Sequence, residues 1–393
     1  MQNNTMTNLP QGWEVKKLED VCKNSSSNLA LKDIKNKSGD YPVFGASGIV
    51  GYIDFYHKNK ECLGIVKDGA GVGRVFVLPK NTSVIGTLNY LEALENTNLK
   101  YLFYFLYSID FSKYILGSAI PHIYFRDYKK EQIPLPPLKE QERIVGILDE
   151  SFAKIDESIK ILEQDLLNLD ELMQSALQKA FNPLKDNAKE NYKLPQGWEW
   201  KNLGEIANTS SGRTPSRNKK EYWENGNIKW LKSGELNDGY IDFIEENITE
   251  EAIKNSSAKI FQKGTLLIAM YGATAGKLGI LNLDSTTNQA ICAFLHKDKN
   301  IKFLEKFLFY FLFFLRDKII KDSFGGAQPN ISQTYIKNLQ IPLPPLKEQE
   351  QIASHLDELS SHVKNLKQNY QAQIKDLQEL KKSLLDKAFK GNL

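Results

Sequence analysis

Cysteine and histidine are scarce in this chain. Its 393 residues include five histidines and three cysteines, Cys22, Cys62 and Cys292. The cysteines are odd in number, widely spaced and without a CxxC pair, which argues against a disulfide framework and against a structural zinc site. No second histidine, cysteine or acid lies at ligand spacing from His122, so the sequence predicts neither a metal ion nor a cofactor. A reducing cytoplasm is the simplest location for such a chain.

Long apolar runs are absent as well. The most apolar stretch runs from Phe307 to Leu315 and has nine residues, whereas a helix needs about 20 residues to span a bilayer. This stretch therefore predicts a buried helix, and no membrane association is expected. The first residues, MQNNTMTNLPQGWE, contain no basic segment followed by an apolar one, so no signal peptide is expected either.

An excess of charge of one sign is also missing. The formal net charge is +3, from 51 lysines and arginines against 48 acids. Any affinity for phosphate must therefore come from local basic patches and not from the chain as a whole. The length and the 41% hydrophobic content are sufficient for two globular domains with connecting elements.

Short catalytic motifs are not found. The chain has no methyltransferase motif of the NPPY kind, no helicase P-loop and no recognisable Ser/His/Asp arrangement, and its histidines are scattered. The sequence therefore predicts a protein that is not itself an enzyme. Nucleases built from carboxylates and a lysine carry no such short motif, so an enzyme of that kind, active as the purified chain alone, stays open as a hypothesis.

What the chain does contain is an internal repeat. LPQGWEVKKLEDV from Leu9 reappears as LPQGWEWKNLGEI from Leu194, an offset of 185 residues. QIPLPPLKEQERIVGILDE from Gln132 returns as QIPLPPLKEQEQIASHLDE from Gln340, an offset of 208 residues, and LQKAF returns as LDKAF at the same offset. The chain is thus two versions of one unit.

The repeat is uneven along each unit. Its edges are nearly identical, while the interiors, about 45–130 and 210–330, share only scattered positions such as the GYIDF segments from Gly51 and Gly239. Loop drift after an old duplication is one explanation. The contrast within a single chain favours another, a duplicated scaffold that carries two surfaces selected to differ.

Both interiors mix short β-branched and aromatic runs with Gly, Asn and Asp turns. Examples are GRVFVLP from Gly73 and GTLLIAM from Gly264. These patterns predict α/β globular domains rich in strands. An aromatic helix is expected to follow in each domain, at 101–109 and 303–320, and to pack against the sheet.

A long helix is expected after each copy of IPLPPL. The prolines exclude helix up to that point, so the first helix should begin near Leu138, with Glu140 and Glu142 favourably placed in its first turn. The apolar residues that follow have a spacing close to 4-3, which is typical of a coiled-coil seam. They are Ile144, Leu148, Phe152, Ile155, Ile159, Leu162, Leu166, Leu169, Met173 and Ala176, and in the second copy Ile352, Leu356, Leu359, Val363, Leu366, Tyr370, Ile374, Leu377, Leu380 and Leu384. About 40 residues give each helix a length of roughly 60 Å.

The expected fold class is α+β, with two α/β domains joined by two long antiparallel coiled-coil helices and a pseudo-two-fold internal repeat. Two such helices can bury their seams against each other without a partner, and an antiparallel pair would place one domain near each end of the rod. The expected boundaries are 1–137 for the first domain, 138–181 for the first long helix, 182–193 for a polar linker, 194–345 for the second domain and 346–391 for the second long helix.

These motifs together resemble the specificity subunits of type I restriction-modification enzymes. The resemblance rests on LPQGWE at the start of each half, GATAGKLG at Gly272–Gly279, GAQPNIS within Gly325–Ser332 and IPLPPLKEQE before each long helix, and it covers essentially the whole chain. The first half departs from it, with GAGVGR at Gly69–Arg74 in place of GATAGK, and GSAIPHI at Gly117–Ile123 in place of GGAQPNI.

The resemblance implies a specific division of labour. The two variable interiors would be target recognition domains, each reading one half of a bipartite site in double-stranded DNA. The paired helices would set the gap between the half-sites and dock two methyltransferase subunits, and a motor-nuclease subunit can join to cut DNA. The chain itself would be non-catalytic, since the chemistry belongs to the partner subunits.

The best basic patch is RTPSRNKK in the second domain. It holds four cations within eight residues and no acid, as expected for contacts with phosphates and base edges. A solvated loop is the other explanation. Lys232 and Ser233 follow Trp230, which is expected to belong to the core rather than to stack on a base.

Glycine-rich turns offer a second kind of contact. In Gly272–Lys277, exposed backbone N–H groups and one lysine could hold a phosphate, but the segment is GxxxGK followed by Leu278 and does not fit a P-loop. A simple tight turn remains the alternative, here and in GAGVGR. The candidate DNA contacts of the second domain are Arg213, Arg217, Asn218, Lys219, Lys220, Lys232, Ser233, Thr274, Lys277, Gln328 and Asn330, and those of the first domain are Lys67, Arg74, His122 and Arg126.

Two functions of different classes fit these features. The leading one is a sequence-specific DNA-binding subunit whose partners carry out the chemistry. The alternative is a coiled-coil spacer whose two domains bind proteins rather than DNA. The steep salt dependence of binding through phosphate contacts would distinguish the two.

Overall fold

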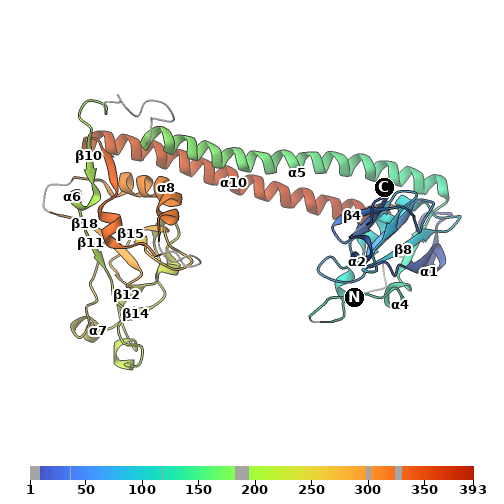
Figure 1. Ribbon diagram of the computed structural model, residues 1–393, viewed down its shortest axis with the longest axis horizontal. Coiled ribbons are helices and arrows are strands. Elements are labelled where there is room, and N and C mark those ends of the chain that lie inside the picture. The colour runs from blue at the N-terminus through green and yellow to red at the C-terminus, as the bar shows by residue number, and fades with distance from the viewer. Residues whose placement is uncertain (1–8, 36, 118, 182–193, 298–301, 324–329) are drawn as a thin grey trace. The chain divides into compact units, whose positions relative to one another are not determined.

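The structure is a computed structural model that describes all residues except 1–8, 36, 118, 182–193, 298–301 and 324–329 (Figure 1). Its contacts divide the chain into two compact units. Unit 1 consists of Met1–Gln164 with Tyr370–Leu393, and unit 2 consists of Asp165–Asn369. The predicted linker, 182–193, lies outside the described residues.

Unit 1 is built around a four-stranded sheet of order β2-β8-β5-β6, next to a three-stranded sheet of order β4-β3-β7. A short antiparallel pair, β1 with β9, joins the segment that begins with LPQGWE to the segment that contains IPLPPL. The elements are β1 (Glu14–Lys17), α1 (Leu18–Val21), β2 (Cys22–Ser26), α2 (Leu31–Ile34), β3 (Tyr41–Gly45), β4 (Gly48–Ile53), β5 (Cys62–Val66), β6 (Val75–Leu78), β7 (Ser83–Val84), β8 (Leu88–Ala93), α3 (Leu99–Ser108), the 3₁₀ helix η1 (Phe111–Tyr114), α4 (Phe125–Tyr128) and β9 (Gln132–Leu135).

Unit 2 repeats this plan with a five-stranded sheet of order β11-β18-β15-β16-β13 and a three-stranded sheet of order β14-β12-β17. The edge pair is β10 with β19. The elements are β10 (Glu199–Asn202), α6 (Leu203–Ile206), β11 (Ala207–Ser211), η2 (Lys220–Tyr222), β12 (Ile228–Leu231), η3 (Ser233–Glu235), β13 (Gly239–Ile241), β14 (Asn247–Ile248), α7 (Glu250–Lys254), β15 (Leu266–Ala269), β16 (Leu278–Leu281), β17 (Thr286–Thr287), β18 (Ile291–His296), α8 (Glu305–Lys321), α9 (Gln333–Lys337) and β19 (Gln340–Leu343).

The two GYIDF segments are not structural equivalents. The first ends β4, which pairs with β3 in the smaller sheet of unit 1. The second forms β13, which pairs in parallel with β16 at the edge of the main sheet of unit 2. The same Gly-Tyr-Ile sequence forms a strand in either place. A short alternation of exposed and buried residues specifies a half-buried strand but not its neighbours.

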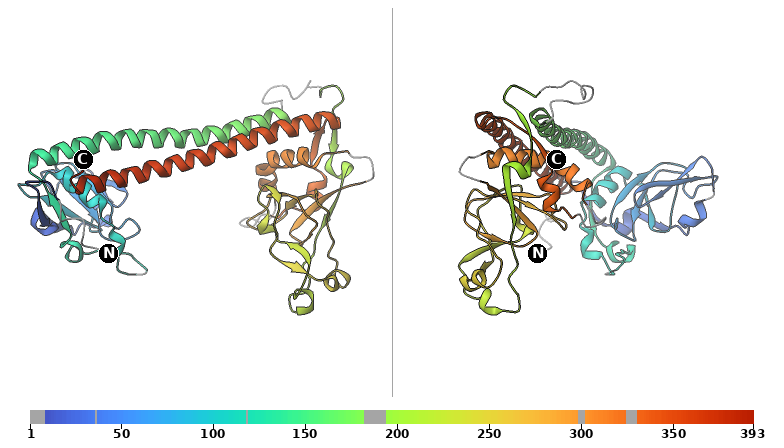
Figure 2. Two further views of the ribbon diagram at one scale, coloured as in Figure 1. Left: turned by 180° about the vertical axis from the view of Figure 1, so that it is seen from behind. Right: turned by 60° about the vertical axis from the view of Figure 1, so that its left-hand side comes forward.

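Two long helices, α5 (Leu138–Phe181) and α10 (Leu346–Phe389), lie side by side (Figures 1 and 2). Lys381 pairs with Asp156 in unit 1 and Lys367 pairs with Asp170 in unit 2. The contacting residue in α5 has a higher number where the one in α10 has a lower number, so the two helices run antiparallel. The predicted fold class, two strand-rich domains with two long packed helices, is confirmed.

The predicted seam holds throughout α5, where all ten positions are buried or half-buried. In α10 two positions fail: Leu366 is 40% exposed and Leu380 is 46% exposed. The next residue takes the seam position in each case, and the Lys381 side chain, 14% exposed, lies 4.8 Å from the Phe152 ring centroid. A straight helix drifts about 20° per heptad against a 3.5-residue repeat, so a strict 4-3 count moves off the contact line.

A buried glutamine fixes the start of each long helix. Gln141 accepts a hydrogen bond from Asn98 N at 2.7 Å and donates to Asn96 O and Pro136 O at 3.0 and 2.7 Å. The equivalent Gln349 accepts from the backbone N of Leu304 and donates to two carbonyl oxygens in the same way. These bonds join the KEQE turn to the start of the aromatic helix, α3 in unit 1 and α8 in unit 2.

The last residue of each long helix is a phenylalanine that packs into the core of one unit. In unit 1, Phe389 of α10 lies 5.2 Å from Tyr101 and 5.4 Å from Phe105, ring centroid to ring centroid. In unit 2, Phe181 of α5 makes similar contacts with two rings of α8. As predicted, α3 and α8 pack against the main sheets. Each core therefore contains the first turns of one long helix and the last turns of the other.

All three cysteines are buried and unpaired. Burial raises the pKa of Cys22 and of Cys292 to about 12, and that of Cys62 to about 11. They therefore act as small apolar core residues. In the part of the chain that the structure describes, no helix is both long and apolar enough to cross a membrane.

Candidate nucleic-acid interface

The two predicted glycine turns have the same backbone. Gly69–Arg74 joins β5 to β6, and Gly272–Lys277 joins β15 to β16. Gly69 and Gly272 open the turns at φ of +93° and +82°, and the glycines four residues later have φ of +88° and +80°. Positive φ strongly favours glycine, so these glycines serve the turn whatever else the loops do.

A second segment lies against each turn. In unit 1, His122 forms a β-bridge with Asp68, and Ile123 N donates to Lys67 O at 2.9 Å. In unit 2, Asn330 bridges Tyr271 and the next residue donates to Met270 O at 2.7 Å. Candidates about 50 residues apart are thereby brought together in the same way in both units. Gln328 lies outside the described residues.

The cations that end the turns are free. Arg74 and Lys277 are exposed, and neither side chain makes a hydrogen bond or ion pair with a described residue. Thr274 is half-buried within the turn of unit 2. Exposed lysine and arginine side chains are among the groups that contact DNA phosphates.

The other candidates of unit 1 are partly engaged. Lys67 pairs with Asp68. The guanidinium of Arg126 lies 4.5 Å from the Tyr124 ring centroid and 3.6 Å from an Asp127 carboxylate oxygen, with 73% of its side chain exposed. His122 packs edge-on against the same tyrosine.

The basic segment of unit 2 is anchored by its backbone. Arg213 N donates to Thr287 O at 2.9 Å, and Arg213 O accepts from Trp230 Nε1 at 3.0 Å. Trp230 is 2% exposed and belongs to the core, as predicted. The segment leaves the side chains of Arg213, Asn218 and Lys220 exposed.

One acid that the sequence did not point to neutralises part of this patch. Glu246 pairs with Arg217 at 2.7 Å and with Lys232 at 2.8 Å. Partial burial would raise the pKa of Glu246, but the hydrogen bonds from Lys232 and Arg217 outweigh burial and lower it. Since Glu246 lies 29 residues after Arg217 along the chain, no local pattern could have revealed the pair.

Arg217 is also held by aromatic rings. Its guanidinium lies 3.6 Å from the Trp223 ring centroid and 4.7 Å from that of Trp230. Lys219 donates to Tyr222 Oη at 3.0 Å, whereas Lys220, 84% exposed, is 4.0 Å from its nearest acid. The predicted patch thus contains ordered cations, Arg217 and Lys219, beside freely solvated ones. Ser233 lies half-buried at the start of η3.

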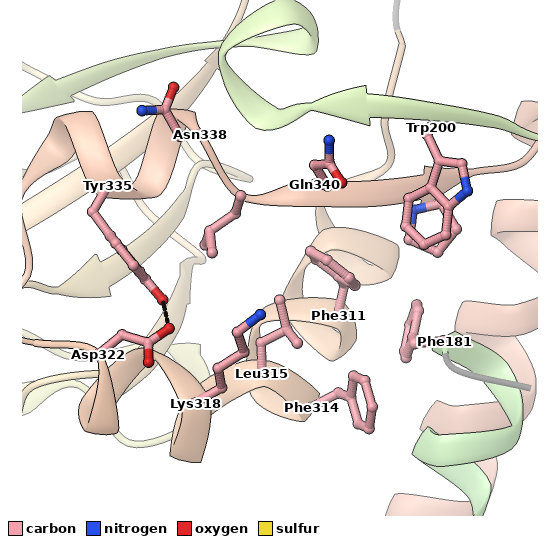
Figure 3. A pocket seen from close by; sticks show the side chains of 12 residues that line it. Phe181, Trp200, Phe311, Phe314, Leu315, Lys318, Asp322, Tyr335, Asn338 and Gln340 are labelled. Carbon is pink, nitrogen blue, oxygen red and sulfur yellow. Dashed lines mark hydrogen bonds between the residues drawn. The ribbon is translucent and has the colours of Figure 1, made fainter. Parts of the chain in front are cut away.

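A separate hollow of unit 2, with a volume of about 520 Å³, lies between α8, β19 and the end of α5 (Figure 3). Its floor is aromatic, with Phe181, Phe311 and Phe314, and Trp200 stands over one side. Tyr335 donates to Asp322 at 2.9 Å along its other wall. None of the predicted DNA contacts lines this hollow. Across the described residues, no group of three or more histidines, cysteines and acids could hold a metal ion.

Two strand-rich domains on paired long helices, each with an exposed cation at a glycine turn, define a repeat-built protein with two comparably built surfaces. The family model of the type I restriction modification DNA specificity domain matches residues 10–166 and 195–376. The chain belongs to this family. It is the DNA specificity subunit of a type I restriction-modification system, and this subunit is non-catalytic within the complex.

Two curated relatives are specificity subunits. The chain is 27% identical over 272 residues to that of the type I restriction enzyme EcoR124I/EcoR124II of Escherichia coli, a match that covers 68% of this chain and 64%, just under two thirds, of that protein. It is 26% identical over 413 residues to the MjaVIII specificity subunit of Methanocaldococcus jannaschii, covering 98% of this chain and 94% of that one.

Two solved structures share the fold. A structure from work on complex assembly and conformational transition of the type I R-M system has a TM-score of 0.76 and 23% identity, and the match covers 98% of this chain and all of that one. The HsdS subunit from Thermoanaerobacter tengcongensis has a TM-score of 0.58 and 22% identity, with 99% of each chain covered.

Proposed function

We propose that each globular domain reads one half of a bipartite site in double-stranded DNA. The observation that carries this is the matched construction of the two turns: Arg74 and Lys277 end equivalent glycine turns, beside His122 and Asn330. Cations at such positions fit phosphate contacts, and the neighbouring imidazole and amide fit base edges. The surrounding sequences differ, which supports two independent codes.

The long helices, in this proposal, set the gap between the half-sites and dock two methyltransferase subunits, and a motor-nuclease subunit can join. Exposed apolar residues along the helices support a docking role: Ile161, Leu167 and Leu172 are 48–58% exposed. The domain boundaries proposed are those expected from the sequence, 1–137 and 194–345 with helices 138–181 and 346–391. The cytoplasm remains the proposed location.

The test is to co-express the chain with the methyltransferase subunit of its own locus and to map methylated adenines by long-read sequencing. A single split motif, with two short specified parts around an unspecified gap, is the expected result. A stable complex that methylates at one continuous motif would contradict half-site reading by two domains.

A further inference from the structure

An open cavity of about 550 Å³, lined by both polar and apolar atoms, lies over the β2–β8 pair of unit 1. Its residues of interest are Asn24, Asn89, Phe125, Lys67, Arg126 and Lys129. The two asparagines belong to neighbouring strands, where Ser26 is paired with Asn89 and Asn24 with Leu91. Phe125 is the first residue of α4 and also lines the cavity.

Two side-chain amide oxygens in this cavity have no hydrogen-bond partner among the protein atoms. Asn89 is 7% exposed, and the Oδ1 atoms of Asn24 and Asn89 are buried without a hydrogen-bond partner. A buried polar atom left without a partner costs about 1–3 kcal/mol, so two in one cavity call for a ligand or another explanation. Neither oxygen is held in place, and each amide can turn to offer a donor and an acceptor to an incoming group.

At the equivalent position of unit 2, a glutamine side chain hydrogen-bonds the polar residues of the strand. Gln333 of α9 accepts from Thr209 Oγ1 at 2.9 Å and donates to Ser211 Oγ at 2.9 Å. Phe125 stands where Gln333 does, because each lies two residues after the isoleucine that bonds the turn segment. Thr209 is likewise the counterpart of Asn24, at the 185-residue offset of the repeat. Unit 1 therefore has no equivalent of Gln333 to hydrogen-bond the polar side chains of β2, as Gln333 does for β11 in unit 2.

Two more matched positions differ in the same direction. Asn89 pairs with Ser26, whereas Ser211 pairs with Cys292, which is fully buried. Lys67 accepts the backbone bond from Ile123, whereas Met270, 5% exposed, does so in unit 2. At these two positions a polar side chain of unit 1 replaces a buried apolar side chain of unit 2, and at Asn24 and Phe125 unit 1 lacks the hydrogen bonds that Gln333 makes in unit 2.

We propose that this cavity is a base-reading site of unit 1, in which Asn24 and Asn89 hydrogen-bond the edge of a DNA base. An asparagine amide matches the donor and acceptor of adenine in the major groove. The cations on the rim, Lys67, Arg126 and Lys129, neutralise the adjoining phosphates. Each is now paired with an acid. The Arg126 side chain is 73% exposed, and exposed pairs are worth about 0–1 kcal/mol, so Arg126 can exchange its acid for a phosphate. The inference rests on the proposed function.

The sharpest test installs the closed network of unit 2 in unit 1. The double variant Asn24→Thr with Phe125→Gln is co-expressed with the methyltransferase subunit, and methylated adenines are mapped as for the wild type. One half of the split motif should change at one or more base pairs while the other half is retained. Methylation of the wild-type site should fall about 10-fold to 100-fold, as for loss of a bidentate base contact.

A second variant distinguishes loss of a base contact from loss of folding. Asn89→Ala removes a side chain whose oxygen makes no hydrogen bond, so the melting temperature of the assembled complex should stay within a few degrees while the same half of the motif relaxes. Ser25→Ala is the matched control, since Ser25 also has an unpartnered oxygen but does not line the cavity. Its motif should be that of the wild type.

The outcomes separate the two proposals. If the wild type yields no split motif, the proposed function fails. If the wild type yields one, and the folded Asn89→Ala and the double variant both keep the two halves unchanged, the cavity holds only water and this inference is overturned while half-site reading stands.

Discussion

Glu246 shows how one side chain can set the state of a basic surface. It pairs with Arg217 and Lys232 at 2.7 and 2.8 Å, and the guanidinium of the same arginine also lies 3.6 and 4.7 Å from the centroids of two tryptophan rings. Because hydrogen bonds from Lys232 and Arg217 lower the pKa of Glu246, the pairs exist at neutral pH. They are lost only as the pH falls through that lowered pKa. The surface is thus partly neutralised when no DNA is bound.

Removing that charge should strengthen DNA binding. In Glu246→Gln, both cations are free to meet phosphates, so the slope of log affinity against log salt should steepen by up to about 1.8, or 0.9 for each additional phosphate that is neutralised. The measurement is a salt titration of DNA binding by the assembled complex. Glu199→Gln is the control, because Glu199 is exposed in the same unit and pairs with Lys201, which is not a predicted DNA-binding residue. Equal slopes for both variants would show that these cations do not reach phosphate.

Lys277 should behave in the opposite way. Lys277→Ala should weaken binding across all DNA sequences and reduce the salt slope by about 0.9. Lys263→Ala carries the same loss of charge at the opposite end of β15, where the side chain is also exposed, and should have little effect. Fluorescence anisotropy at several salt concentrations measures both. A loss confined to one DNA sequence would instead make Lys277 a base contact.

Residue-scale predictions from sequence succeeded where the signal is local. The glycine turns follow from glycines at fixed spacing, and the core position of Trp230 follows from its apolar strand. The pairing of Glu246 and the open amides of Asn24 and Asn89 depend on strands brought together by the fold. Nothing in the residues adjacent to them in sequence records those contacts.

At the scale of elements, the start of each long helix is fixed from both sides. Proline stops the chain from entering a helix early, and a buried glutamine in the first turn then bonds three backbone groups of the preceding segment. Asp149 and Asp357 add a second tie, since each accepts from a tyrosine hydroxyl of the aromatic helix at 2.8 and 2.7 Å. The first turns of a long helix are therefore part of the domain that precedes it.

Loss of either glutamine should loosen one unit only. Gln141→Ala leaves three backbone groups of unit 1 without their partner and should reduce its opening free energy by about 2–4 kcal/mol. Hydrogen exchange of the α3 amides should accelerate, while the α8 amides keep their protection. Gln349→Ala should give the reverse pattern. Glu142→Ala, an exposed neighbour in α5, is the control. Faster exchange in both helices from one substitution would show that each glutamine does not stabilise its own unit alone.

The elements themselves were mostly predictable from the sequence. The prolines and the apolar spacing located both long helices, because these signals are local and repeat over many turns. The exposure of Leu366 and Leu380 was missed because a strict 4-3 count ignores helix drift. Strand neighbours were not predicted, and the GYIDF segments misled, since pairing between distant strands leaves no local pattern.

At the scale of the whole molecule, the repeat predicts separable specificities. Replacing residues 210–335 with the corresponding segment of another family member should change one half of the methylated motif and leave the other half and the gap intact. The replaced segment lies within unit 2, whose core contains its own sheet. Methylation mapping of the chimaera measures the result. A swap that altered both halves would contradict independent reading.

The buried thiols allow the opening of each unit to be measured separately. Cys22 and Cys62 belong to unit 1 and Cys292 belongs to unit 2, and burial suppresses the thiolate at all three. An alkylating reagent can react only when the surrounding strands separate. The rate at which each cysteine acquires mass in dilute denaturant therefore times the opening of its own sheet, in the native chain and without an added probe.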